Sequence, residues 1–144
     1  MEFKPYHLHP AAVHFPIALL SAGAAAAAAR LDRRAPAWFA QAEAWLLRLG
    51  TVSAWAALAL GWWAEKTAPH KPLAWEVLAE HETLAWWTCA VFTVLAVLGF
   101  SGKRGEKLRG LELALWAAGL GLLIATAMHG GELVYGLGMG VGAP

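Results

Sequence analysis

Four long stretches of apolar residues follow one another along the chain, and short segments that carry most of the charged residues separate them. They run from about Pro10 to Ala29, Trp38 to Ala64, Glu82 to Phe100 and Leu111 to Met128. A helix needs about 20 residues to cross a hydrocarbon core of ~30 Å, and each stretch is close to that length or longer. A helix also satisfies its own backbone hydrogen bonds in lipid. The pattern therefore predicts four membrane-spanning helices.

Prolines affect where two of these helices begin. If the first helix began at Pro16, only about 21 Å of helix would precede Arg30, at 1.5 Å per residue, which is too short to span. We therefore expect it to begin near Pro10, with Pro16 leaving one backbone carbonyl without its partner and favouring a kink. The segment from Pro72 to Glu80 has two interpretations, a short amphipathic helix on the membrane surface or an extension of the third span.

The predicted fold is an all-α, integral membrane four-helix bundle that forms one domain over residues 1–144. Short connections make consecutive helices antiparallel neighbours, which gives an up-down-up-down order. Small residues such as Gly23, Ala54, Gly61 and Gly119 allow close helix contact in lipid.

Composition supports a membrane location and excludes several functions. Hydrophobic residues make up 59% of the chain and charged residues 15%, whereas an average soluble domain is about 25% charged. A globule of this size has too little interior to bury so much apolar surface. No basic stripe interleaves with aromatic residues, so nucleic acid is not an expected partner. Cys89 is the only cysteine, which excludes an intramolecular disulfide and a multi-cysteine metal site.

Lysine and arginine residues predict the orientation in the membrane. The connections after the first and third stretches hold seven of them and the opposite side holds three: Arg30, Arg33, Arg34, Lys103, Arg104, Lys107 and Arg109 against Lys4, Lys66 and Lys71. The positive-inside rule places the first set in the cytoplasm. We expect a multi-pass protein of the bacterial inner membrane, surrounded by the lipid bilayer, with both termini in the periplasm.

All six histidines fall near the predicted outer edge of the membrane: His7, His9, His14, His70, His81 and His129. His14 lies one turn inside the start of the first helix, His81 at the start of the third and His129 at the end of the fourth. Ionisable residues inside a membrane usually face the bundle interior and serve function, and imidazole is the commonest metal ligand. The agreement in depth therefore indicates a candidate cofactor site. The alternative interpretation is that each histidine is an ordinary residue of the membrane interface.

A b-type haem is the first hypothesis for this site, since its iron takes two imidazoles directed inward from facing helices. The first and third helices are diagonal in an up-down bundle, and neighbouring axes ~8–10 Å apart leave roughly 12–14 Å between them. His14 and His81 are the first choice of axial ligands. His129 is the substitute or a partner of a haem propionate, and His9 is a helper.

The haem hypothesis makes the protein an electron carrier or complex subunit rather than an enzyme, and no catalytic residue is predicted. Because the histidines lie near one face only, the chain alone is not expected to carry electrons across the bilayer. A quinol, a periplasmic cytochrome or a larger membrane complex would exchange electrons near the outer face. Two alternatives stay open: a copper or zinc site built from His14, His81 and His129, and a cofactor-free scaffold subunit of a respiratory-type complex.

The chain opens with HPAAVHFPIALL at residues 9–20 and closes with HGGELVYG at residues 129–136. Both stretches resemble the corresponding parts of a family of predicted bacterial membrane proteins catalogued as domain of unknown function 2231. His81, followed by an apolar helix, is similar to the third-span histidine of that family. The resemblance covers nearly the whole chain. It implies a four-span membrane domain, sometimes found beside respiratory or cytochrome-like modules, and its motifs include His9, His14 and His129.

Overall fold

The computed structural model describes residues 4–69, 71–100 and 106–140. Within these ranges the chain is almost entirely helical and has no strand, which confirms the predicted all-α class. The α-helices of these ranges are α1 (Leu8–Ala12), α2 (His14–Ala29), α3 (Trp38–Thr67), α4 (Trp75–Phe100) and α5 (Glu106–Gly131). Short turns of other helix types flank them, with 3₁₀ turns at Pro5–His7 and Pro72–Ala74 and a π-helical turn at Glu132–Gly136.

The first span consists of α1 and α2, with an interruption at Val13 that Pro16 explains. Proline has no N–H, so the carbonyl four residues before it has no helical partner. The chain stays helical across the interruption, because Val13 N–H donates to the carbonyl of His9 at 3.1 Å and Ile17 N–H donates to that of Val13 at 3.3 Å. The first span begins at Pro5, earlier than predicted, so His9 lies inside it and not before it.

The third span also begins earlier than predicted, because the segment before Glu82 extends it and does not form a separate surface helix. The 3₁₀ turn at Pro72–Ala74 leads directly into α4. Proline suits this first turn because a helix start needs no N–H there. Among the described residues, four helical segments are long and apolar enough to cross a membrane: Pro5–Ala29, Trp38–Thr67, Pro72–Gly99 and Leu108–Gly136.

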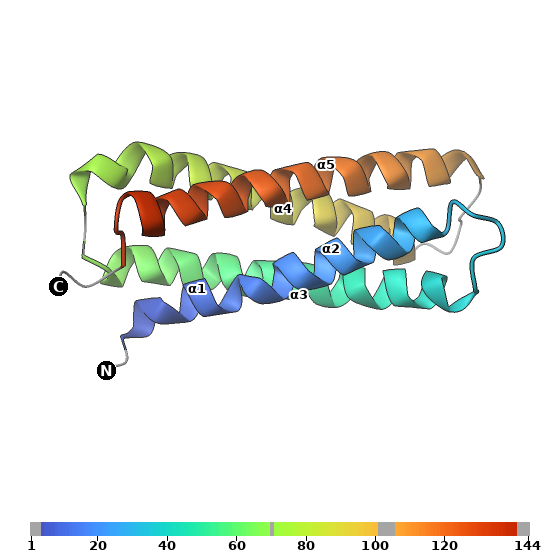
Figure 1. Ribbon diagram of the computed structural model, residues 1–144, viewed down its shortest axis with the longest axis horizontal. Coiled ribbons are helices and arrows are strands. Elements are labelled where there is room, and N and C mark those ends of the chain that lie inside the picture. Colours follow the sequence, from blue (N-terminus) through green and yellow to red (C-terminus); the bar gives the residue numbers. More distant parts are fainter. Residues whose placement is uncertain (1–3, 70, 101–105, 141–144) are drawn as a thin grey trace.

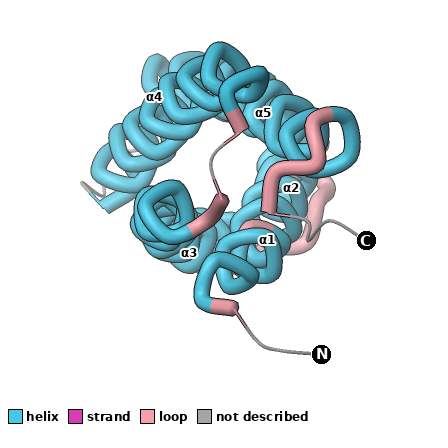
Figure 2. Tube along the Cα trace, turned by 90° about the vertical axis from the view of Figure 1, so that its left-hand side faces the viewer, coloured by secondary structure: helices cyan, strands magenta, loops and turns pink. Residues whose placement is uncertain are grey.

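The four spans pack as an up-down-up-down bundle (Figure 1). The end view shows α2 and α4 at opposite corners, with α3 and α5 packed against both of them (Figure 2). One end of the bundle holds the N-terminus, the α3–α4 connection and the end of α5, and we call it the termini end. The other end holds the α2–α3 connection and the start of α5, and we call it the arginine end.

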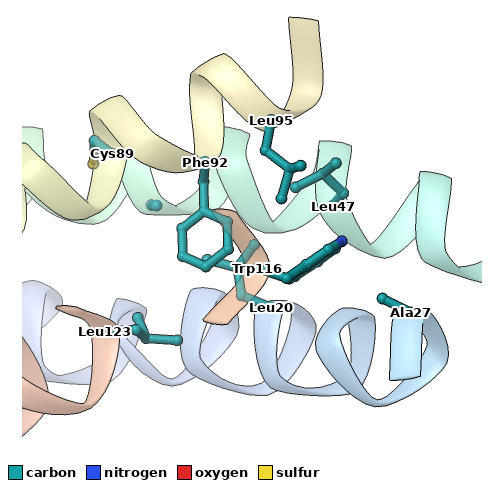
Figure 3. Close-up of a cluster of buried hydrophobic side chains, with 9 residues drawn as sticks. Leu20, Ala27, Leu47, Cys89, Phe92, Leu95, Trp116 and Leu123 are labelled. Carbon is teal, nitrogen blue, oxygen red and sulfur yellow. The ribbon is translucent and has the colours of Figure 1, made fainter. Parts of the chain in front are cut away.

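Large side chains in the core pack against glycines of the neighbouring helix. Phe92, Leu20 and Leu95 are almost completely buried (Figure 3). A Cβ atom on Gly119 would lie 2.8 Å from the ring of Phe92, and one on Gly50 would lie 2.6 Å from Leu20. Glycine at these two positions therefore allows the close contact between helices that holds a bundle together in lipid.

The outer surface of the bundle is apolar. Only 22–28% of the most apolar window of each span is buried inside the protein. Trp62, Trp86 and Ile124 are each more than half exposed. A contiguous apolar exterior of this extent would be unfavourable in water, and it matches the surface that four membrane-spanning helices present to lipid.

A buried charge cluster closes the arginine end. Glu43 of α3 is 3% exposed. It accepts hydrogen bonds from Arg30 at the end of α2 and from Arg109 and Trp116 of α5, with the indole N–H at 3.1 Å. Arg109 also donates to the carbonyl of Ala27 at 2.8 Å. One carboxylate therefore joins α2, α3 and α5.

Candidate functional site

Two imidazole rings lie beside each other at the termini end of the bundle. His9 is on α1 and His81 is on α4; their ring centres are 6.2 Å apart and their planes are inclined by 78°. Because α1 continues into α2, the rings come from the two spans at opposite corners of the bundle. The first and third spans thus supply one imidazole each. In the first span this residue is His9, whereas the sequence favours His14.

Each ring has one nitrogen fixed by a backbone carbonyl of the neighbouring helix. Nδ1 of His9 donates to the carbonyl of Ala57 in α3 at 2.9 Å, and Nδ1 of His81 donates to that of Thr126 in α5 at 3.0 Å. A carbonyl oxygen can only accept, so each Nδ1 carries the proton and Nε2 of the neutral ring has a lone pair. Among the described residues, neither Nε2 has a hydrogen-bond partner. Histidines that bind metals are usually held in this way.

A glycine leaves room for each ring. A Cβ atom on Gly61 would lie 3.0 Å from Cε1 of His9, and one on Gly130 would lie 3.1 Å from Cε1 of His81. Each glycine follows the carbonyl acceptor of its ring by four residues, so it lies one turn further along the same helix face. A larger residue at either position would push the ring away from its carbonyl.

His129 lies at the same end of the bundle, but both of its ring nitrogens are engaged. Nδ1 contacts the carbonyl of Ala125 in its own helix at 2.9 Å, and Nε2 contacts the carboxylate of Glu80 in α4 at 3.2 Å. Both partners are acceptors. An imidazole that makes both contacts donates from both nitrogens and has no lone pair left for a metal ion. In this arrangement His129 forms a polar contact between α4 and α5 at the edge of the site.

The other histidines do not join this pair. His14 is exposed on α2, and His7 is exposed with its ring centre 4.7 Å from that of Tyr6. His70 lies outside the described residues. Over the ranges that the structure describes, no group of three or more His, Cys, Asp or Glu side chains is arranged to hold a metal ion. The structure does not bring His14, His81 and His129 together as a group. A metal site built from them stays a prediction.

The role of His9 depends on where the first helix begins. The sequence predicts that His9 lies before this helix and His14 inside it, whereas α1 already begins at Leu8. His9 and His14 are five residues apart, which puts them on different faces of a continuous helix. A single sequence does not show which of these faces is turned toward the third span.

Gly61 and Gly130 are the part of the site that the sequence interpretation does not assign, since it takes Gly61 as a helix-packing residue and Gly130 as part of the closing motif. A signal for them is present in the sequence. Each follows another close-packed glycine of the same helix, Gly50 or Gly119, at an identical spacing. Such a repeated spacing indicates that two helices contact their neighbours in the same way.

The fold and the site together define a class: a membrane protein of four helical spans with a pair of imidazoles at one end of the bundle. The chain matches the family described as "Predicted membrane protein (DUF2231)" over residues 5–143, and it belongs to that family. The family resemblance of the chain is thereby confirmed. No curated protein and no solved structure matches the chain.

Proposed function

We propose that this protein is a membrane electron-transfer protein, or a subunit of an electron-transfer complex, that holds one b-type haem between His9 and His81. The observation that carries the proposal is the pairing of two imidazoles that each have a fixed Nδ1 proton and an Nε2 lone pair. Two imidazoles that bind one metal ion from opposite sides have ring centres roughly 6 Å apart, given metal–nitrogen bonds of about 2.0 Å. The ring centres of His9 and His81 are 6.2 Å apart.

Two ligands on opposite corners of a bundle suit haem better than zinc. Haem would bring four porphyrin nitrogens of its own, so His9 and His81 would be the only ligands that the protein needs to supply. A structural zinc ion takes four protein ligands and a catalytic one takes three, and the described residues contain no group of three. The apolar interior of a bundle is also a common place for a cofactor of this kind.

Haem would supply a reversible one-electron couple at this position. His9 and His81 would be the ligands, and the carbonyls of Ala57 and Thr126 fix the orientation of their rings. By accepting hydrogen bonds from Nδ1–H, these carbonyls also make each Nε2 a stronger electron donor. Because Gly61 and Gly130 have no side chain, the rings can stay within hydrogen-bond distance of these carbonyls.

The proposed orientation places the termini end at the periplasmic face of the bacterial inner membrane. The support is the excess of lysine and arginine in the connections of the arginine end. The imidazole pair then lies near the periplasm, and one site at one end does not carry an electron across the bilayer. The electron partner would therefore be a quinol, a periplasmic cytochrome or a larger complex that reaches the outer face.

Absorption spectroscopy of the detergent-solubilised protein from haem-replete cells tests this proposal. We expect a Soret band, sharp visible bands after reduction with dithionite, and one haem per chain. Elemental analysis of the same sample separates the alternatives. Colourless protein that contains copper or zinc would support a histidine metal site, and colourless, metal-free protein would support the cofactor-free scaffold. Either result would overturn the haem proposal.

A further inference from the structure

The helices α3 and α5 carry the same pattern of buried glutamates and close-packed glycines. In each of them a buried glutamate precedes two close-packed glycines at identical spacings: Glu43, Gly50 and Gly61 in α3, and Glu112, Gly119 and Gly130 in α5. The glutamates lie toward the arginine end and the second glycines toward the termini end. The two helices therefore correspond position by position along the bundle.

The spans that pack against α3 and α5 correspond as well. His9 and Leu20 in the first span have the same separation as His81 and Phe92 in the third. Their contacts also match, since Leu20 lies on Gly50 of α3 and Phe92 lies on Gly119 of α5. The imidazole of His9 lies on Gly61, and that of His81 lies on Gly130. Each helix pair thus makes one apolar contact in the core and one imidazole contact at the termini end.

We infer that the bundle consists of two equivalent helix pairs, and that Gly61 and Gly130 are the residues that position the two imidazoles. The consequence for haem rests on the proposed function, whereas the positioning of the rings does not. Because the two halves are equivalent, they offer two like nitrogen ligands to whatever binds between them. Such a pair would suit a metal centre that takes two nitrogen ligands from the protein, such as a haem iron.

Each glycine works together with the carbonyl four residues before it. In an α-helix the N–H of Gly61 donates to the carbonyl of Ala57, and the second lone pair of this oxygen accepts Nδ1–H of His9. The ring that makes this hydrogen bond also lies against the glycine, where a side chain would begin. A Cβ atom there would be closer to the ring than ordinary contacts allow, so the ring would shift by a few tenths of an ångström. The same argument applies to Gly130 and His81.

The test replaces each glycine by alanine in the full-length protein and follows the histidine side chains by ¹⁵N NMR, without and with haem. We expect Gly61→Ala to change the Nδ1 and Nε2 signals of His9, and Gly130→Ala to change those of His81. In haem-loaded protein, each variant should weaken haem binding about tenfold or more, as the loss of an outer hydrogen-bond partner usually does.

Two matched variants separate positioning from general damage. Gly131→Ala adds the same methyl group at the next residue, where nothing lies within 4 Å, and should leave both sets of signals unchanged. Gly119→Ala places a Cβ atom 2.8 Å from Phe92 and should lower stability without altering the histidine signals. Unchanged signals in Gly61→Ala and Gly130→Ala, or equal changes in Gly131→Ala, would overturn the inference. If the wild-type protein proves colourless, the proposed function fails, while the signals of the haem-free protein still decide whether these glycines position the rings.

Discussion

The position of one proton decides what each imidazole at the termini end can do. His9 and His81 place Nδ1–H on a carbonyl of another helix, so Nε2 has its lone pair. His129 has an acceptor at each nitrogen, which gives it a different chemistry although it lies at the same end. Whether a ring keeps a lone pair therefore follows from its hydrogen bonds and not from its depth in the membrane.

The angle between the two rings predicts a spectroscopic property of the oxidised, haem-loaded protein. The planes of His9 and His81 are inclined by 78°. If a haem iron bound both rings and they kept this inclination, two of its d orbitals would lie close in energy and the largest g value would be high. We expect a strongly anisotropic low-spin signal in frozen-solution electron paramagnetic resonance. A rhombic spectrum typical of parallel planes would contradict this prediction.

Glu43 supports a prediction about stability at the arginine end. Breaking a buried ion pair by removing one partner costs about 3–5 kcal/mol, and we expect about 3 kcal/mol for Glu43→Ala. The lower value applies because the side chains of Arg30 and Arg109 are 23% and 25% exposed and can turn toward water. The free energy of unfolding in mixed micelles measures the effect, with the exposed Gln41→Ala as control. Because the cluster lies at the opposite end from the imidazoles, a loss of haem in this variant would count against the account.

At the residue scale, the sequence predicts the depth of the site but not its pairing. The levels of His81 and His129 follow from the lengths of the apolar stretches, which are readable directly. The choice between His9 and His14 depends on the helix face that α1 turns toward α4. That face is set by packing in three dimensions, because apolar residues surround the whole helix and no polar stripe marks its inner side.

At the scale of elements, the number and type of helices follow from the sequence, while several of their ends do not. Apolar length predicts only the part of a helix that lies in hydrocarbon. The helices α3 and α4 continue beyond it, to Thr67 and from Trp75 onward. The polar residues beyond the apolar stretches stay helical, because helical backbone hydrogen bonds form in water as well as in lipid.

Close helix contact at glycines leads to a prediction about packing. A Cβ atom on Gly50 would lie 2.6 Å from Leu20. Such overpacking costs about 1–3 kcal/mol, so Gly50→Ala should lower the free energy of unfolding by that amount. Gly121 has nothing within 4 Å, and Gly121→Ala should be neutral or stabilise by up to about 1 kcal/mol through helix propensity. Equal effects of the two substitutions would show that the glycine contacts do not hold α2 against α3.

The whole molecule has different chemistry at its two ends. The termini end carries the imidazole pair, and the arginine end carries the cluster around Glu43. In the part of the chain that the structure describes, an apolar core separates the imidazole pair from the ion cluster. The orientation of the protein therefore decides which side of the membrane the imidazole pair faces.

Single-cysteine labelling tests the orientation. Cys89 is 2% exposed and is replaced by serine to give a cysteine-free chain. Leu73→Cys then adds a thiol at the termini end, where residue 73 is 89% exposed, and Leu31→Cys adds one at the arginine end, where residue 31 is 64% exposed. A maleimide that does not cross the inner membrane should label Leu73→Cys in cells with a permeabilised outer membrane. It should label Leu31→Cys only after the inner membrane is broken, and the reverse pattern would invert the orientation.

The most direct test of the central claim is the haem content of three variants purified alongside the wild-type protein. If His9 and His81 hold the haem, His9→Ala and His81→Ala should each lose the low-spin spectrum or most of the haem. His14→Ala should keep one haem per chain with an unchanged reduced spectrum. Full haem content in His9→Ala, or loss of haem in His14→Ala alone, would contradict the pairing on which this account depends.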